Sequence, residues 1–192
     1  MLKYTGYIRK IRYYSESSHY IVALLEVEED QELLTMNGYM SNFNDYDKYA
    51  FYGDFEIHPK YGQQFKLDHY EIVLSTDEEE IIKYLSSPLF KGIGPTQAKY
   101  IVDALGENAL SLIKEDKHHL DLVKGMTVAK RELIYEVLTS NDYDQEVTQF
   151  FMGHGISLRH IGIIQETYKE KTLEILQNHP YQLVEDIDGI GF

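Results

Sequence analysis

The spacing of apolar residues changes near position 76, and this change limits the folds open to the chain more than any other feature. Before it, apolar and polar residues alternate, with the apolar set beginning at Ile21, Ala23, Leu25 and Val27. After it, apolar residues follow a helical spacing, as in Ala98, Ile101, Val102 and Leu105. A period of two is typical of strands, and a period near 3.6 is typical of helices. The sequence therefore predicts a β domain over residues 1–76 and an all-α region over residues 77–192.

The first 76 residues have the aromatic and β-branched content of a small sheet. Of the 17 tyrosines, 11 precede residue 81, and tyrosine favours strands. We expect five or six strands, within residues 4–14, 21–27, 33–40, 49–57 and 65–74. A second alternating set is expected to share one sheet face: Tyr49, Phe51, Gly53, Phe55 and Ile57. Pro59 and Gly62 predict a turn before the last strand, because proline fixes φ and glycine tolerates a positive φ. So many short strands predict a closed barrel, which hides its edges.

The all-α region repeats itself at an offset of 63 residues. This offset places Gly92 on Gly155, Ile101 on Ile164 and Leu110 on Leu173. Repeats of this length are typical of stacked units, so we expect one tandem helical array. It would contain four glycine hairpins, at residues 90–95, 123–127, 152–157 and 187–192. The last hairpin stops where its second helix should begin, and we therefore expect the chain to be a fragment of a longer protein.

The hairpin at residues 90–95 carries the sharpest local signal, because it resembles a helix-hairpin-helix motif. Two glycines permit a tight turn, Ile93 is expected to point into the core, and peptide N–H groups are left at a helix start, where they can bind a phosphate. We expect Gly94 to need a positive φ. The predicted DNA contacts are Lys91, Gly92, Ile93, Gly94, Thr96 and Lys99. The alternative, that such hairpins only connect helices, stays open.

The other hairpins carry weaker signals. In the second hairpin, Lys124, Gly125 and Lys130 are further candidate DNA contacts, and Arg131 adds positive charge. Thr127 stands where a second glycine is expected, which puts phosphate binding by this hairpin in doubt. The third hairpin has only Arg159 and His160 nearby, and we assign it mainly to packing.

Composition excludes several classes of function. Lys and Arg number 18 against 32 Asp and Glu, for a net charge of −14. Residues 1–80 hold 7 basic and 16 acidic side chains, and residues 81–192 hold 11 and 16, so any contact with nucleic acid should be local and weak. The absence of cysteine excludes disulfides and thiolate metal sites. Because the sequence also lacks a signal peptide and a long apolar run, we expect no membrane contact and a cytoplasmic location.

The sequence offers no catalytic or metal-binding residues. No Gly-x-x-x-x-Gly-Lys-Ser/Thr motif is present, so we expect these 192 residues not to hydrolyse ATP. His118 and His119 are interpreted as a solvated pair and not as metal ligands. Four barrel tyrosines could stack on single-stranded bases, but we favour a place in the core or at its rim: Tyr7, Tyr13, Tyr14 and Tyr52.

Several motifs together resemble a known family. They are Gly6 with Tyr20-Ile21-Val22, Tyr52-Gly53-Asp54-Phe55, the stretch His58 to Phe65, Tyr84 to Ser87 before the first hairpin, Asn178 to Leu183, and Gly189 to Phe192. In this order they are similar to the N-terminal region of bacterial RecD-like ATP-dependent DNA helicases. The match spans nearly the whole chain, with departures at Pro88-Leu89 and Thr127.

The resemblance implies a multidomain α+β fold, in which a small OB-like β-barrel precedes an all-α tandem helix-hairpin-helix array. It implies an accessory region that binds the DNA backbone without sequence preference, on single strands or junctions, ahead of motor domains that use ATP and magnesium to move 5′ to 3′. Contacts with those motor domains and with repair or replication proteins are further expectations. The alternatives are a RuvA-type Holliday-junction clamp and an acidic protein-interaction scaffold.

Overall fold

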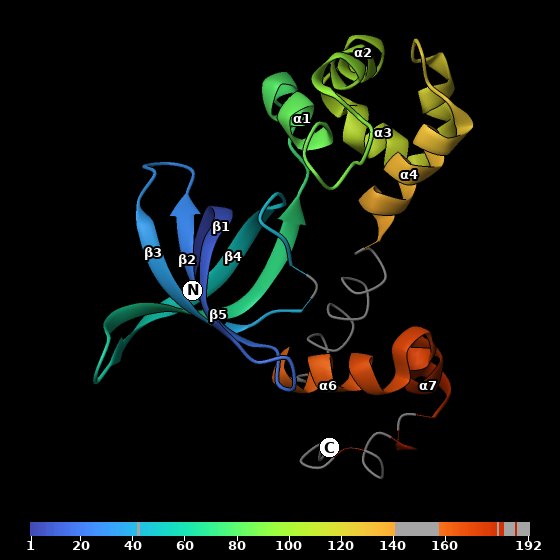
Figure 1. The fold of residues 1–192 in the computed structure, drawn as a ribbon. Coiled ribbons are helices and arrows are strands. Elements are labelled where there is room, and N and C mark those ends of the chain that lie inside the picture. Colours follow the sequence, from blue (N-terminus) through green and yellow to red (C-terminus); the bar gives the residue numbers. More distant parts are fainter. Residues whose placement is uncertain (42, 141–157, 180, 183–186, 188–192) are drawn as a thin grey trace. The chain divides into compact units, whose positions relative to one another are not determined.

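The computed structural model describes residues 1–41, 43–140, 158–179, 181–182 and 187 (Figure 1). By their contacts the residues form two compact units. The first comprises residues 1–45, 49–71 and 143–192, and the second comprises 46–48 and 72–142. The division expected after residue 76 falls between the last strand and the first helix.

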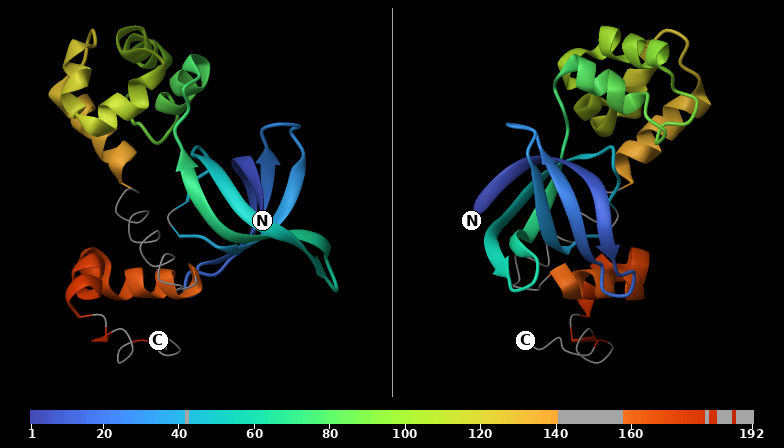
Figure 2. Two further views of the ribbon diagram at one scale, coloured as in Figure 1. Left: turned by 180° about the vertical axis from the view of Figure 1, so that it is seen from behind. Right: turned by 60° about the vertical axis from the view of Figure 1, so that its left-hand side comes forward.

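Five strands of the first unit close into a barrel (Figures 1 and 2). They are β1 (Leu2–Tyr14), β2 (Tyr20–Val27), β3 (Leu33–Tyr39), β4 (Lys48–His58) and β5 (Gly62–Val73). Around the barrel the order is β1-β2-β3-β5-β4. The β3–β5 pair is parallel, whereas β1 is antiparallel to both β2 and β4. The predicted barrel is confirmed, and Gly62 has the positive φ of +74° expected at the turn before β5.

The barrel core follows the predicted alternation along β2. Ile21 and Ala23 are fully buried, and Leu25 and Val27 are at most 3% exposed. They pack with Met36 from β3 and the aromatic residues of the other strands, which are also buried: Tyr49, Phe51 and Phe65. Burial of this apolar surface is the main force that closes the barrel.

The β4–β5 hairpin projects beyond the barrel, as two opposite views show (Figures 1 and 2). The pairing of β1 with β4 ends at Leu2 opposite Gly53, so the rest of β4 extends past that partner. Phe55 is 38% exposed and Ile57 is 84% exposed. The alternation correctly indicated the strand, but it does not show where the neighbouring strand ends.

The second unit is a compact helical bundle. It contains α1 (Glu78–Leu85), α2 (Pro95–Leu105), η1 (Gly106–Asn108), α3 (Ala109–Glu115), η2 (Lys117–Leu122) and α4 (Val128–Thr139). Asp77 caps α1 by accepting the Glu80 N–H at 2.9 Å. Its apolar core contains residues of the hairpins at 90–95 and 123–127 and of the helices. The fully buried core residues include Ala98, Ile101, Ile113, Leu120 and Ile134.

The remaining helices in the described part of the chain confirm the 63-residue repeat. They are α6 (Leu158–Tyr168), η3 (Lys169–Lys171) and α7 (Thr172–Asn178). The helices α6, η3 and α7 begin and end 63 positions after α2, η1 and α3, respectively. Ile101 and Ile164, which the repeat makes equivalent, are both fully buried. The third predicted hairpin (152–157) lies outside the described residues, as does the fourth (187–192) except for Ile187.

The part of the chain that the structure describes contains neither a membrane-crossing helix nor a cluster of metal ligands. Within that part of the chain, no helix combines the length and apolarity needed to cross a membrane. The same residues contain no group of three or more His, Cys, Asp or Glu side chains placed to hold a metal ion.

Candidate nucleic-acid interface

The first hairpin turns at Gly92, and this corrects the prediction for Gly94. Gly92 has a φ of +85°, in the region that favours glycine. Gly94 instead has φ −90° and ψ 173° and forms the N-cap of α2, with Pro95 as the first helical residue. A Cβ added at Gly94 would meet nothing within 4 Å. The turn therefore needs glycine at position 92, while an extended N-cap accepts many residues.

Ile93 holds this hairpin to the core. Its side chain is 4% exposed, and its N–H donates to the Phe90 carbonyl at 3.0 Å. Phe90 is buried and packs edge-on against Tyr84, with ring centroids 5.1 Å apart. Among the predicted contacts, Ile93 therefore supplies packing. The others lie exposed around the turn and the first turns of α2: Lys91, Gly92, Gly94, Thr96 and Lys99.

The second hairpin has the same backbone geometry, 33 positions later. Gly125 has a φ of +74°, matching Gly92. Thr127 is the N-cap of α4 at φ −111° and ψ 160°, matching Gly94. Its Oγ1 accepts the Lys130 N–H at 3.3 Å. Thr127 in place of a second glycine therefore does not prevent the hairpin conformation. This position needs no positive φ, and threonine is a good N-cap.

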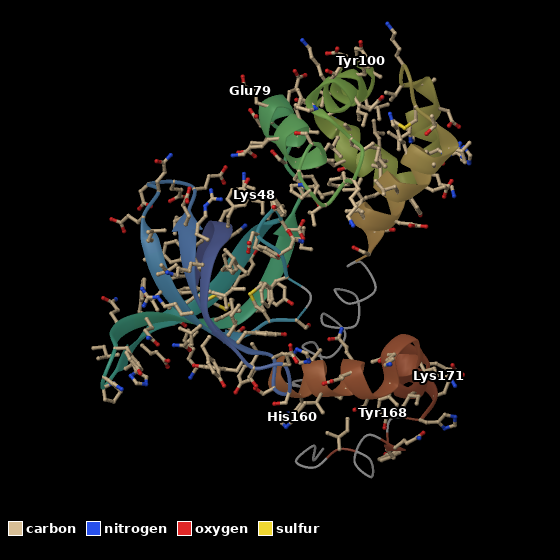
Figure 3. All side chains as sticks on the ribbon, viewed as in Figure 1. Lys48, Glu79, Tyr100, His160, Tyr168 and Lys171 are labelled. Carbon is tan, nitrogen blue, oxygen red and sulfur yellow. The ribbon has the colours of Figure 1, made fainter. Side chains whose placement is uncertain are left out.

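Gln97 joins the two hairpins. Its Nε2 donates to the Lys124 carbonyl at 3.0 Å, and its Oε1 accepts from Lys130 Nζ at 3.5 Å. Lys124 Nζ also lies 5.5 Å from the ring centroid of Tyr100, which is labelled on α2 in Figure 3. The structure therefore brings the predicted contacts of the second hairpin, Lys124, Gly125 and Lys130, beside those of the first.

Sequence reasoning missed Gln97 and the 33-residue offset. The offset was available as Lys-Gly-Ile at 91–93 and Lys-Gly-Met at 124–126. The contacts of Gln97 join residues 27 and 33 positions apart, and no local pattern marks such a residue.

Arg131 does not add free positive charge to the second hairpin, contrary to the prediction. Its side chain is 14% exposed, with Nη1 2.7 Å from Asp121 Oδ1 and Nη2 3.3 Å from Glu132 Oε1. Hydrogen bonds from His118, foremost, and from Arg131 hold the pKa of Asp121 below its ordinary value. The pKa of Glu132 is lowered too, first by Lys117 and then by Arg131. The basic character of this hairpin therefore rests on Lys124 and Lys130.

The two adjacent histidines have different environments. His118 is exposed, with Nδ1 2.8 Å from Asp121 Oδ2. His119 is half-buried, and its Nδ1 lies 2.9 Å from the carbonyl oxygens of both Leu112 and Asp116. The predicted solvated pair is therefore wrong for His119, which ties η2 to the end of α3.

All four barrel tyrosines lie beside a neighbouring side chain, and three of them are half-buried. Tyr52 stacks on His69 at 4.3 Å. The Tyr14 hydroxyl lies 2.9 Å from His19 Nδ1, and the Arg9 guanidinium lies 5.2 Å from the Tyr7 ring centroid. Tyr13 lies 6.4 Å from Tyr20 between ring centroids but is 57% exposed, so it does not fill the core.

Two family models match this chain. Residues 1–75 match the OB-fold domain of the ATP-dependent DNA helicase YrrC. Residues 140–192 match the HHH domain of the ATP-dependent RecD2 DNA helicase, a range in which the structure describes α6, η3 and α7. The two hairpins joined by Gln97 lie between the matched ranges. With these two domains in this order, the chain belongs to the RecD2-like family of ATP-dependent DNA helicases and represents the family's N-terminal OB-fold and helix-hairpin-helix region.

Proposed function

We propose that this helicase accessory region binds the DNA backbone without sequence preference, through the hairpins at residues 90–95 and 123–127. One observation carries the proposal: two glycine turns of the same backbone conformation lie side by side, and each precedes a helix N-terminus flanked by lysines. Peptide N–H groups at a helix start and lysine side chains are typical phosphate ligands.

The chemistry of the hairpins favours phosphate over base recognition. Gly94 has no side chain to occupy the N–H groups of the first turn of α2, and Lys91, Lys99 and Lys124 are exposed. Lysine donates to a phosphate as a point charge, and it lacks the rigid planar donor fork of arginine. With at most four lysines involved, binding should be weak and salt-sensitive.

The wider role follows from the family and belongs to the same proposal. The motor domains would bind ATP and magnesium and move 5′ to 3′, while this region guides single-stranded or junction DNA and contacts repair or replication proteins. The sequence has no phosphate-binding loop for ATP, so we assign that cofactor and its magnesium to the motor domains. A cytoplasmic location would follow from DNA as partner.

Fluorescence anisotropy with labelled single strands, duplexes and four-way junctions tests the proposal. The informative variant is Lys91→Gln/Lys99→Gln, which removes charge but keeps most of each side chain. The matched control is Lys83→Gln/Lys171→Gln, because these exposed lysines lie outside both hairpins. We expect the first pair to weaken binding roughly tenfold and the control to have little effect. An equal loss from both pairs would contradict the proposal.

A protein-interaction scaffold is the second candidate function. It is favoured by the exposed apolar tip of the β4–β5 hairpin, where Ile57 is 84% and Tyr61 is 63% exposed, and by the net charge of −14. If the chain binds none of the three DNA forms, this function replaces the first. A strong preference for the four-way junction would instead favour a RuvA-type clamp.

A further inference from the structure

Equivalent positions of the two hairpins contact each other. The 33-residue offset that superposes Lys91 on Lys124 and Gly92 on Gly125 also places Gln97 on Lys130. Lys130 Nζ donates to Gln97 Oε1 at 3.5 Å. The same glutamine donates from Nε2 to the Lys124 carbonyl at 3.0 Å. The Gln97 amide therefore donates one hydrogen bond and accepts another, and its two partners, Lys124 and Lys130, lie on either side of Gly125 in the sequence.

From these contacts we propose that Gln97 is a positioning residue, which sets the two hairpins at a fixed spacing so that both bind one DNA molecule at the same time. The inference rests on the proposed function, because it concerns how the same lysines are presented to phosphates. It adds that the two hairpins form a single two-point interface and are not independent sites.

The surroundings of Gln97 support a specific geometric role. A Cβ added at Gly125 would lie 3.4 Å from Gln97 Oε1, so the amide oxygen of Gln97 lies close beside the turn. Lys130 connects the contact to the cap of α4, since its backbone N–H donates to Thr127 Oγ1. Gln97 thus contacts the second hairpin at the turn and, through Lys130, at its helix start.

We expect the fold of the unit not to depend on this contact. Gln97 is only half-buried, and the hairpins are already tied to a shared apolar core through Ile93, Ala98 and Val123. Hydrophobic burial supplies most of the stability of such a bundle. Replacing the amide by an apolar side chain of similar length should therefore loosen the spacing of the hairpins and leave the bundle folded.

Fixed spacing has a measurable consequence for binding. When two contacts belong to one rigid body, the second forms at a high effective concentration once the first is made. If the spacing is lost, the second hairpin contributes little, while the first keeps its own contacts. The effect of a charge change at Lys124 should therefore depend on Gln97, and the effect of a change at Lys91 should not.

A double-mutant cycle tests this directly. Lys91→Gln and Lys124→Gln are each made in the unaltered chain and in the Gln97→Met background, and anisotropy is measured with whichever labelled single strand, duplex or junction binds most tightly. We expect each lysine change to cost about threefold in affinity in the unaltered chain. In the Gln97→Met background we expect the cost of Lys91→Gln to persist and that of Lys124→Gln to disappear. Gln63→Met, an exposed glutamine in the barrel, is the control and should change neither.

The same cycle distinguishes failure of this inference from failure of the proposed function. If Lys124→Gln costs the same in both backgrounds, Gln97 does not position the hairpins, and the proposed function stands without this inference. If neither lysine change affects binding in the unaltered chain, the proposed function is wrong, and this inference falls with it. Circular dichroism melts check the fold, and Gln97→Asn, which shortens the side chain but keeps the amide, replaces Gln97→Met if the latter melts early.

Discussion

Gly92 and Gly125 have nearly the same left-handed backbone conformation, with φ of +85° and +74°, although they lie in different hairpins. Each is followed two positions later by an extended N-cap, Gly94 or Thr127. The chain therefore builds one turn twice within this unit. The likeness of the two turns is the basis for treating both hairpins as phosphate contacts.

Gly92→Ala should destabilise the helical unit by about 1 kcal/mol, because an L side chain is disfavoured at this φ. A Cβ at this position would meet nothing within 4 Å, so the cost is one of backbone conformation alone. Urea denaturation measures it. Gly94→Ser is the control, and its free energy of unfolding should stay within about 0.5 kcal/mol of the unaltered chain, since serine is a good N-cap.

The same Gly94→Ser change should weaken DNA binding by about threefold while the fold is kept. Serine at an N-cap accepts an N–H of the first helical turn, which is then less available to a phosphate. Thr127 already does this in the second hairpin, where its Oγ1 accepts the Lys130 N–H. Anisotropy titrations at one salt concentration give the measurement. Unchanged affinity would mean that the N–H groups of α2 do not contact DNA.

Asp121→Asn should lower stability near neutral pH, with an effect that shrinks in acid. Hydrogen bonds from His118 and Arg131 lower the pKa of the Asp121 carboxyl in the folded chain. Its stabilising contribution is therefore fully present above the unfolded pKa of about 4 and is lost as the pH falls through the lower folded value. Urea denaturation of both chains between pH 7 and about pH 3 should show converging stabilities. A difference that grows in acid would contradict the assignment.

Gly6→Ala should destabilise the barrel by about 2 kcal/mol or more. A Cβ at this position of β1 would lie 1.9 Å from the Glu26 carbonyl oxygen on β2, so the paired strands would have to separate. Thermal unfolding followed by near-ultraviolet circular dichroism reports on the barrel tyrosines. The exposed Ile57→Ser is the matched control and should change the melting temperature little, because the side chain is 84% exposed.

Patterns along the chain predicted the barrel and the helical repeat well, because strands and helices each leave a regular spacing of apolar residues in the sequence. The alternation at Ile21 to Val27 became the core face of β2, and the 63-residue repeat reappeared in the boundaries of six helical segments. Exposure of Ile57 could not be predicted in this way, because it depends on where the neighbouring β1 begins.

The sequence predicted the individual residues of the candidate site but not the contacts that bring the two hairpins together. The lysines and glycines of both hairpins follow from a motif, since the motif is local. A Gly-x-Gly pattern does not show which glycine takes the positive φ, and the structure has it at Gly92 and not at Gly94. The contact of Gln97 with Lys124 and the pairing of Arg131 with Asp121 depend on tertiary packing, which no spacing rule contains.

The salt dependence of DNA binding tests the central claim most directly. Each phosphate contact made by a lysine contributes a little under one unit to the slope of log affinity against log salt. With Lys91, Lys99, Lys124 and Lys130 as the candidates, we expect a slope no steeper than about −4. For Lys91→Gln/Lys99→Gln we expect it to become shallower by up to about two units. A slope that this double change leaves unaltered, in a chain that still binds DNA, would show that the first hairpin does not contact the backbone and would contradict the account.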